Sequence, residues 1–270
     1  MNLDFDKLLA ARKRLLRMHF ESGVGHVGGN LSALDAMLLL FHEFIGDQDR
    51  FILSKGHSAG ALYVSLWSKG LLDDDELRQF HQDGTRLAGH PPASGIAEIP
   101  FATGSLGHGL SLAAGTALAR RLSGHPGHTH CMTSDGEWQE GSTWEALIFL
   151  NHHRLRNLTV LIDHNRLRGF GFTDQVASML PLEERLRGFN NIDDLCVLGH
   201  DLDAIRAALI RPRAPDDHRQ RFLILQTVKG HGVSFMENKM EWHYLPLDEA
   251  RYPQVVLDQS RLLLAALAVE

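Results

Sequence analysis

The sequence has only two cysteines in 270 residues, Cys131 and Cys196. Each lies in an apolar stretch, so the pair predicts core packing in a reducing compartment and excludes a disulfide framework. The longest uncharged apolar run, 262–269, is far shorter than a bilayer span. The first twenty residues mix charges with leucines and lack the apolar core of a signal peptide. These absences predict a cytoplasmic protein with no membrane partner.

An excess of positive charge is also missing. Lysine and arginine total 27 against 33 aspartates and glutamates, a formal net charge of −6. A chain of this sign does not attract nucleic acid or an anionic membrane over a distance, so no nucleic-acid partner is expected. Any anionic ligand must therefore be held by a local arrangement of groups.

The chain does contain short apolar runs that alternate with longer helical patterns, which is typical of an α/β fold with a mainly parallel sheet flanked by helices. Strands are expected at 128–133, 157–163, 192–197 and 221–228. Helices are expected at 3–21, 30–44, 57–69, 105–122, 141–153, 182–188 and 201–210. The stretch 84–104 has no period and is expected to be a loop that lines a site. No boundary stands out, so residues 1–270 are predicted to form a single domain.

A polar segment follows the first expected strand, Ser134-Asp135-Gly136-Glu137-Trp138-Gln139-Glu140-Gly141. If strands 128–133 and 157–163 are parallel neighbours, Asp135 and Asn165 face one another at the carboxyl edge of the sheet. Carboxylate, amide and carbonyl oxygens suit Mg²⁺ or Ca²⁺, and a diphosphate would complete the coordination and meet backbone N–H groups at the glycine turn. Either piece alone is more simply an ordinary turn after a strand.

Together, an Asp-Gly pair and an asparagine thirty residues later resemble the thiamine-diphosphate motif. The resemblance extends over almost the whole chain and is specific to the amino-terminal part of transketolases. The segments that carry it are 22–29 (SGVGHVGG), 49–57 (DRFILSKGH), 89–91 (GHP), 104–109 (GSLGHG), 134–146 (SDGEWQEGSTWEA), 227–230 (TVKG) and 241–243 (EWH). The implied fold is the thiamine-diphosphate-binding fold in its diphosphate-binding (PP) form.

The resemblance also implies a role for each matching residue. The metal, Mg²⁺ or else Ca²⁺ or Mn²⁺, would be bound by Asp135, Asn165 and the backbone carbonyl of Leu167. The cofactor, thiamine diphosphate, would be contacted by His57, Gly104, Leu106, Gly107, Asp135, Gly136, Glu137, Asn165 and His243. Catalytic roles fall to His26, His90, His243 and Glu140.

Among these, His26 and His90 would line the channel where sugar hydroxyls and protons are handled, and Glu140 would lie at a subunit interface near the cofactor. An imidazole suits this work because its pKa lies near physiological pH. Without the resemblance, each histidine would more often be structural or solvated. Glu140 would be an exposed acid favoured at the start of a helix.

In transketolases the glutamate that activates the cofactor belongs to a later pyrimidine-binding domain, beyond the matched region. The resemblance therefore implies a second subunit that carries the pyrimidine-binding and C-terminal domains, in an α2β2 assembly. The implied reaction transfers a two-carbon ketol unit from a ketose to an aldehyde. The alternatives are another thiamine-dependent carboligase with a 2-oxo acid donor, which would release carbon dioxide, and a degenerate cofactor-binding module without activity.

Several positions depart from the family pattern. Ser134 stands where glycine usually precedes the aspartate, Val27 where proline is usual, and Tyr244 where glycine is common. After Asn165, the segment 168–171 (RGFG), which includes Arg168 and Phe170, replaces the expected glutamine and Asp-Gly. The metal ligands survive these changes, but the diphosphate cradle and the substrate channel are altered. The sugar or ketone substrate is thus left open, a specialised one included.

Overall fold

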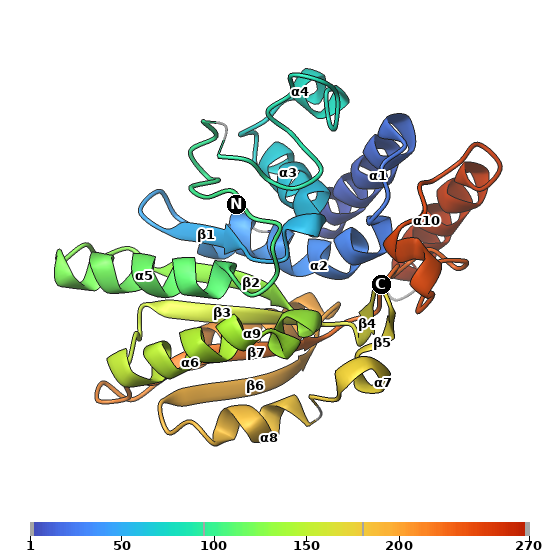
Figure 1. The fold of residues 1–270 in the computed structure, drawn as a ribbon. Coiled ribbons are helices and arrows are strands. Elements are labelled where there is room, and N and C mark those ends of the chain that lie inside the picture. Colours follow the sequence, from blue (N-terminus) through green and yellow to red (C-terminus); the bar gives the residue numbers. More distant parts are fainter. Residues whose placement is uncertain (1–2, 94, 180, 268–270) are drawn as a thin grey trace. The chain divides into compact units, whose positions relative to one another are not determined.

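The computed structural model describes residues 3–93, 95–179 and 181–267 (Figure 1). The chain divides into two compact units whose segments alternate along the sequence. The first contains Met1–Phe44, His57–His90 and Val228–Glu270, and the second contains Ile45–Gly56 and Pro91–Thr227. The single domain over residues 1–270 stays a prediction.

The second unit is built on a five-stranded sheet in the order β1-β2-β3-β7-β6. The strands are β1 (Arg50–Leu53), β2 (Thr129–Ser134), β3 (Leu158–His164), β7 (Gln220–Gln226) and β6 (Ile192–Leu198). Every pairing between them is parallel. Both β2 and β3 are buried along their whole length, as is usual for central strands of a parallel sheet that is covered on both faces. The predicted mainly parallel sheet is confirmed.

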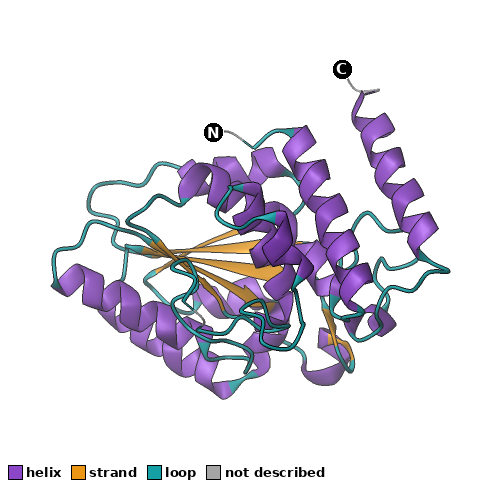
Figure 2. Ribbon diagram, turned by 90° about the horizontal axis from the view of Figure 1, so that it is seen from above, coloured by secondary structure: helices purple, strands orange, loops and turns teal. Residues whose placement is uncertain are grey.

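Helices of the same unit cover this sheet. They are α5 (Gly109–Leu122), α6 (Gly141–His153), α7 (Thr173–Ala177), α8 (Leu182–Arg187) and α9 (Leu202–Ile210). Leu110 of α5, Leu147 of α6 and Leu186 of α8 share one buried cluster with Val160 and Phe222 of the sheet. Figure 2 shows the strands side by side with helices along them. These contacts hold the carboxyl ends of the strands, and the segments that follow them, in fixed positions.

The first unit is helical. It contains α1 (Phe5–Ser22), α2 (Val27–Leu39) extended by a π-helix (Leu40–Phe44), α3 (Ala59–Ser68), α4 (Asp74–Arg78), a 3₁₀ turn (Met240–His243) and α10 (Tyr252–Leu267). The Asp4 side chain caps the start of α1 by accepting from the Lys7 N–H, and Gly23, with φ of 64°, ends it. Every residue of α2 is buried. Such a helix has no polar face in its sequence, because it forms the centre of its unit.

Several sequence expectations need correction. The helix expected at 105–122 begins only at Gly109, because Gly107 has φ of 83° and cannot continue a helix. Strand β1 was not expected, since a run of four residues, three of them buried, shows no period. The antiparallel pair β4 (Leu167–Arg168) and β5 (Gly171–Phe172) was also missed. Cys196 is exposed and not in the core, because it lies on β6, the last strand of the sheet.

Two further expectations can be compared with the structure. Among the described residues, no helix has both the length and the apolar character that a bilayer span requires. Cys131 is buried in the core as predicted.

Buried histidines make the fold sensitive to acid. Burial lowers the pKa of His128 to about 4 and of His130 to about 3, against an ordinary value near 6.5. The unfolded chain binds protons at these sites as the pH falls below about 6.5, whereas the folded chain does not until far lower pH. The stabilisation is therefore fully present above about pH 6.5 and is lost progressively below it, by about 2 kcal/mol per histidine at pH 5.

We expect His130→Leu to reduce the fall in the free energy of unfolding between about pH 7.5 and pH 5, measured by urea denaturation. His152→Leu is the matched control, because His152 is exposed. An identical pH dependence in the two variants would contradict this account.

Candidate active site

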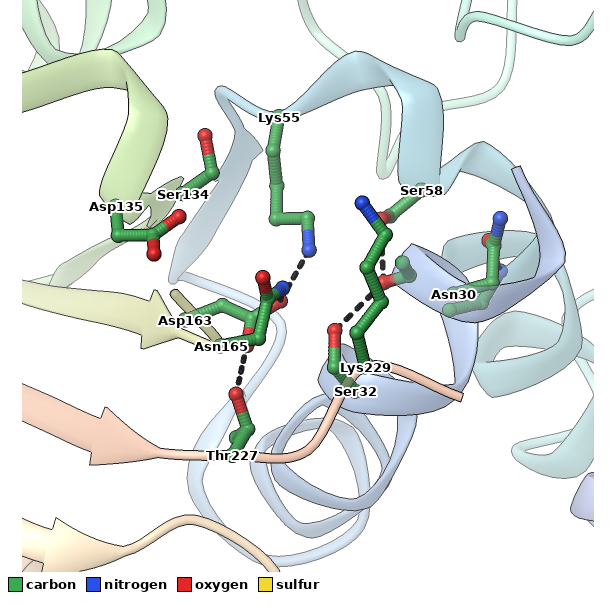
Figure 3. A network of polar contacts seen from close by, with 12 residues as sticks. Asn30, Ser32, Lys55, Ser58, Ser134, Asp135, Asp163, Asn165, Thr227 and Lys229 are labelled. Atoms are coloured by element: carbon green, nitrogen blue, oxygen red, sulfur yellow. Dashed lines mark hydrogen bonds and ion pairs between the residues drawn. The ribbon is translucent and has the colours of Figure 1, made fainter. Parts of the chain in front are cut away.

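Two strand ends of the second unit place Asp135 and Asn165 at the same edge of the sheet. Asp135 directly follows β2, Asn165 directly follows β3, and the parallel register pairs Ser134 with Asp163. The backbone N–H of Arg166 donates to Oδ2 of Asp135 over 2.6 Å. The predicted juxtaposition of the Asp-Gly turn and the asparagine is therefore present (Figure 3).

The Asp163 side chain links several segments at this edge of the sheet. Its fully buried carboxylate pairs with the fully buried ammonium of Lys55 and accepts from the Thr227 hydroxyl. It also accepts from Nδ2 of Asn165 at 3.3 Å. The Asn165 amide is thereby oriented with its nitrogen towards Asp163, and its Oδ1 accepts from the N–H of Leu167 at 3.1 Å. Sequence reasoning missed Lys55 and Asp163, although a lysine just after one apolar run and an aspartate within another were the available signal.

The Asp135 carboxylate suits a cation. Within the described residues it accepts from the N–H groups of Gly136 and Arg166 and from the Thr173 hydroxyl, and from no lysine or arginine side chain. Burial raises its pKa, and the nearby Asp163 raises it further, while His164 acts in the opposite direction. A divalent cation would offset the cost of burying this charge, and carboxylate and amide oxygens are the ligands that Mg²⁺ and Ca²⁺ prefer.

Glu137 joins three segments of the second unit. Its Oε1 accepts from the Ser54 hydroxyl and from the N–H of Gly107 at 2.9 Å, and its Oε2 accepts from the N–H of Ser134 at 2.8 Å. Burial raises the pKa of this carboxyl, and these hydrogen bonds oppose the shift. In this structure Glu137 fixes the loop around Gly107 against β2, so a role as a direct cofactor contact stays a prediction.

The loop 104–107 carries the other predicted cofactor contacts. A Cβ at Gly107 would lie 2.5 Å from Oγ of Ser142, and its φ of 83° already favours glycine. Gly104 lies against Gly56, where an added Cβ would meet the Gly104 nitrogen at 2.8 Å. Leu106 is half-buried. These contacts fix the backbone of the loop 104–107, and its two glycines have no side chain that would keep a ligand away from it.

Four predicted histidines meet in the first unit. Ring centroids lie 5.0 Å apart for His26 and His243, 5.7 Å for His26 and His57, 5.9 Å for His26 and His90, and 5.6 Å for His57 and His243. They come from four separate segments of the chain. Partial burial, together with the charge of His81, lowers the pKa of His90. The structure thus brings together four histidines that the sequence analysis named, and their roles stay predictions.

Asn30, which sequence reasoning missed, ties two of these segments together. Its Nδ2 donates to the carbonyls of His26 at 2.9 Å and His57 at 3.2 Å, and its Oδ1 accepts from the N–H of Ala61. His26 has φ of 62°, a conformation that is costly for a residue other than glycine and is common at functional sites. The Asn30 amide supports it. An asparagine within an otherwise apolar helical stretch was the signal.

Lys229 sets the state of His243. Its side chain is almost fully buried, and its ammonium lies 2.6 Å from Nδ1 of His243. Because an ammonium only donates, Nδ1 accepts, and the imidazole is neutral with its proton on Nε2. His243 can therefore offer an N–H to a ligand.

Glu140 is paired rather than isolated. Its carboxylate lies 3.6 Å from the guanidinium of Arg168, one of the residues that depart from the family pattern. Arg168 also lies against Gly136, where an added Cβ would be 3.3 Å from its Nε.

A hollow of the second unit lies away from the predicted site residues. It has a volume of about 540 Å³ and is lined by residues such as Arg121 in the last turn of α5, His153 at the end of α6 and Asn157 just before β3. Arg121 donates to the carbonyls of His153 and Arg154 at the end of α6, which explains its position. None of the predicted site residues lines this hollow.

The chain is similar to proteins of the transketolase family. A model of the transketolase thiamine diphosphate binding domain matches residues 6–256. The chain is 34% identical to one of the subunits of the apulose-4-phosphate transketolase of Phocaeicola vulgatus, over 92% of this chain and 91% of that one. It is 33% identical to the 6-deoxy-6-sulfo-D-fructose transketolase subunit SqwG of a Clostridium species, over 93% and 94%.

Solved structures show the same fold. Transketolase from Leishmania mexicana superposes with a TM-score of 0.84 at 25% identity, covering 96% of this chain and 42% of that one. A transketolase from Pichia stipitis has a TM-score of 0.85 at 24% identity, covering 94% and 40%. This chain thus spans well under half the length of these solved transketolases.

The fold and the family match define a thiamine-diphosphate-binding α/β protein. The family match and the full-length relatives show that the chain belongs to the transketolase family, whose enzymes are thiamine-diphosphate-dependent transferases. Its matches over the whole length of subunit-type chains are those of an amino-terminal transketolase subunit.

Glu137 gives a test of how this edge is built. Glu137→Ala would leave the N–H groups of Gly107 and Ser134 and the Ser54 hydroxyl without their buried acceptor, so we expect a loss of roughly 3 kcal/mol in the free energy of unfolding. Chemical denaturation measures it. Glu145→Ala is the control, because Glu145 is exposed on α6, and equal stability of the two variants would show that Glu137 does not hold the loop.

Proposed function

We propose that this chain is the diphosphate-binding subunit of a split transketolase that transfers a two-carbon ketol unit from a ketose to an aldehyde. The observation that carries the proposal is the parallel register that places Asp135 and Asn165 at adjacent strand ends. Two relatives that match over their whole length are named as transketolase subunits. The substrate class proposed is a small sugar or ketone.

The residues present fit a metal-bound diphosphate. Asp135, Asn165 and the carbonyl of Leu167 would hold Mg²⁺, and the phosphates would enter over Gly136, where the Arg168 side chain lies. Bound thiamine diphosphate supplies the nucleophilic carbon and the electron sink of the reaction. Gly104, Leu106 and Gly107 would contact its rings through backbone and apolar surface, while Glu137 would act by holding Gly107 in place.

The histidine cluster would bind the sugar substrate and move its protons. By resemblance, His57 and His243 contact the cofactor, and the neutral His243 can donate from Nε2 because Lys229 occupies Nδ1. His26 and His90 would bind substrate hydroxyls and move protons. The lowered pKa of His90 keeps its ring neutral near pH 7, so that it can accept a proton.

The subunit would need a partner. We propose that the chain forms one PP domain and that a second chain carries the pyrimidine-binding and C-terminal domains, including the activating glutamate, in a cytoplasmic α2β2 assembly. Glu140, about two-fifths exposed at its side chain, would lie at that interface.

Metal dependence tests the site. We expect thiamine diphosphate to bind only with a divalent cation, because without one the phosphates would face the Asp135 carboxylate as like charges. Asp135→Ala should abolish metal-dependent binding, measured by titration calorimetry on the complex with its partner. Binding that persists undiminished in excess chelator would rule out the metal assignment.

The dependence of turnover on the second subunit tests the split arrangement of the enzyme. The purified chain alone should show no ketol transfer, and adding the second subunit should restore turnover, followed by a coupled assay of the aldehyde product. Release of carbon dioxide from a 2-oxo acid donor would instead indicate the alternative carboligase. Turnover by the single chain would refute the split arrangement.

A further inference from the structure

Arg168 covers the Asp-Gly turn. An added Cβ at Gly136 would meet Nε of Arg168 at 3.3 Å and its Cγ at 3.5 Å, and these Arg168 atoms are the nearest neighbours of that position. The space that glycine provides in this chain is therefore covered by an arginine side chain.

The backbone of Arg168 is fixed, but its side chain can exchange partners. The N–H of Thr173 donates to the Arg166 carbonyl at 2.9 Å and closes the β4–β5 pair, and Gln139 donates to the Thr173 carbonyl at 2.8 Å and holds the pair to the Asp-Gly segment. The guanidinium, in contrast, forms a 3.6 Å ion pair with Glu140, whose side chain is 41% exposed. Ion pairs with this length and exposure are weak.

The charge balance at this edge favours a further cation. Three carboxylates, Asp135, Glu137 and Asp163, lie in the buried part of the edge, and the buried ammonium of Lys55 is already paired with Asp163. A diphosphate arriving with one divalent cation would add net negative charge to this group. A guanidinium is the side chain best suited to bind phosphate oxygens, because it donates two parallel hydrogen bonds.

We propose that Arg168 is a cofactor-binding residue, which exchanges its pair with Glu140 for the diphosphate that enters over Gly136. This inference rests on the proposed function, since it assumes that the Asp-Gly turn binds a diphosphate. Glu140 is then a competitor for Arg168 and not a ligand. A purely structural pair, joining the β4–β5 segment to the start of α6, would have no effect on cofactor affinity.

The experiment measures the dissociation constant of thiamine diphosphate by titration calorimetry, with Mg²⁺ and on the complex with the partner subunit. We expect Arg168→Gln to raise this constant by about 10- to 100-fold, the effect typical of losing a charge-assisted hydrogen bond. Arg187→Gln is the matched control. It removes the same charge from an exposed arginine of the same unit, paired with Asp194 at 3.2 Å, and should leave the constant unchanged.

Two further measurements distinguish a cofactor-binding role of Arg168 from a purely structural one. Glu140→Gln should tighten binding or leave it unchanged, because it removes the competitor; weakening as large as that of Arg168→Gln would overturn the exchange. Thermal unfolding of the Arg168→Gln complex should match that of Arg187→Gln, which excludes a folding defect. If the wild-type complex binds no thiamine diphosphate, the proposed function fails; if it binds and Arg168→Gln binds equally well, only the role of Arg168 is overturned.

Discussion

The parallel register of β2 and β3 is the constraint on which the candidate site depends. Because Ser134 is paired with Asp163, the next residues of both strands leave the sheet together, and Asp135 and Asn165 meet there. A slip of one residue would turn every side chain of one strand to the opposite face. Both strands are buried on both faces, so such a slip would not expose an obvious polar face. Particular polar contacts then fix the strand ends: the Arg166 N–H donates to Asp135 after β2, and Asp163 at the end of β3 bonds to Lys55 and Thr227.

Asp163 does this with a buried charge, which is costly without partners. Lys55 and Thr227 lie in the segments that follow β1 and β7, and each bonds to this one carboxylate. The ends of β1, β3 and β7 are thereby held together. The Asn165 amide, which directly follows β3, also donates to Asp163, and its oxygen is turned away from the aspartate. The sheet's apolar core alone would tolerate small shifts of these ends. The buried ion pair makes their positions specific, which a metal site with fixed ligand geometry needs.

The sequence could predict what is local or periodic. Alternation of apolar runs and helices predicted the parallel sheet, and the spacing from Asp135 to Asn165 predicted their meeting, because both follow directly from strand topology. It could not predict the pair of Lys55 with Asp163, whose members lie 108 residues apart, or that of Arg168 with Glu140, since neither follows from a period or a turn. Strand β1 was not predicted because so short a run has no pattern of its own. Helix α5 begins later than predicted because the Gly107 backbone is held in a left-handed conformation by its neighbours.

Backbone strain occurs beside predicted site residues in each unit. His26 in the first unit and Arg166 in the second both have φ of 62°, and each is held by hydrogen bonds of its own unit, from Asn30 to the His26 carbonyl and from the Arg166 N–H to Asp135. Neither conformation would persist in an isolated peptide, because residues with a Cβ disfavour it. Each is maintained because the surrounding fold determines the backbone on both sides. A departure from the family pattern such as Arg168 can therefore change the charge presented to a ligand without disturbing the backbone that positions the proposed metal ligands.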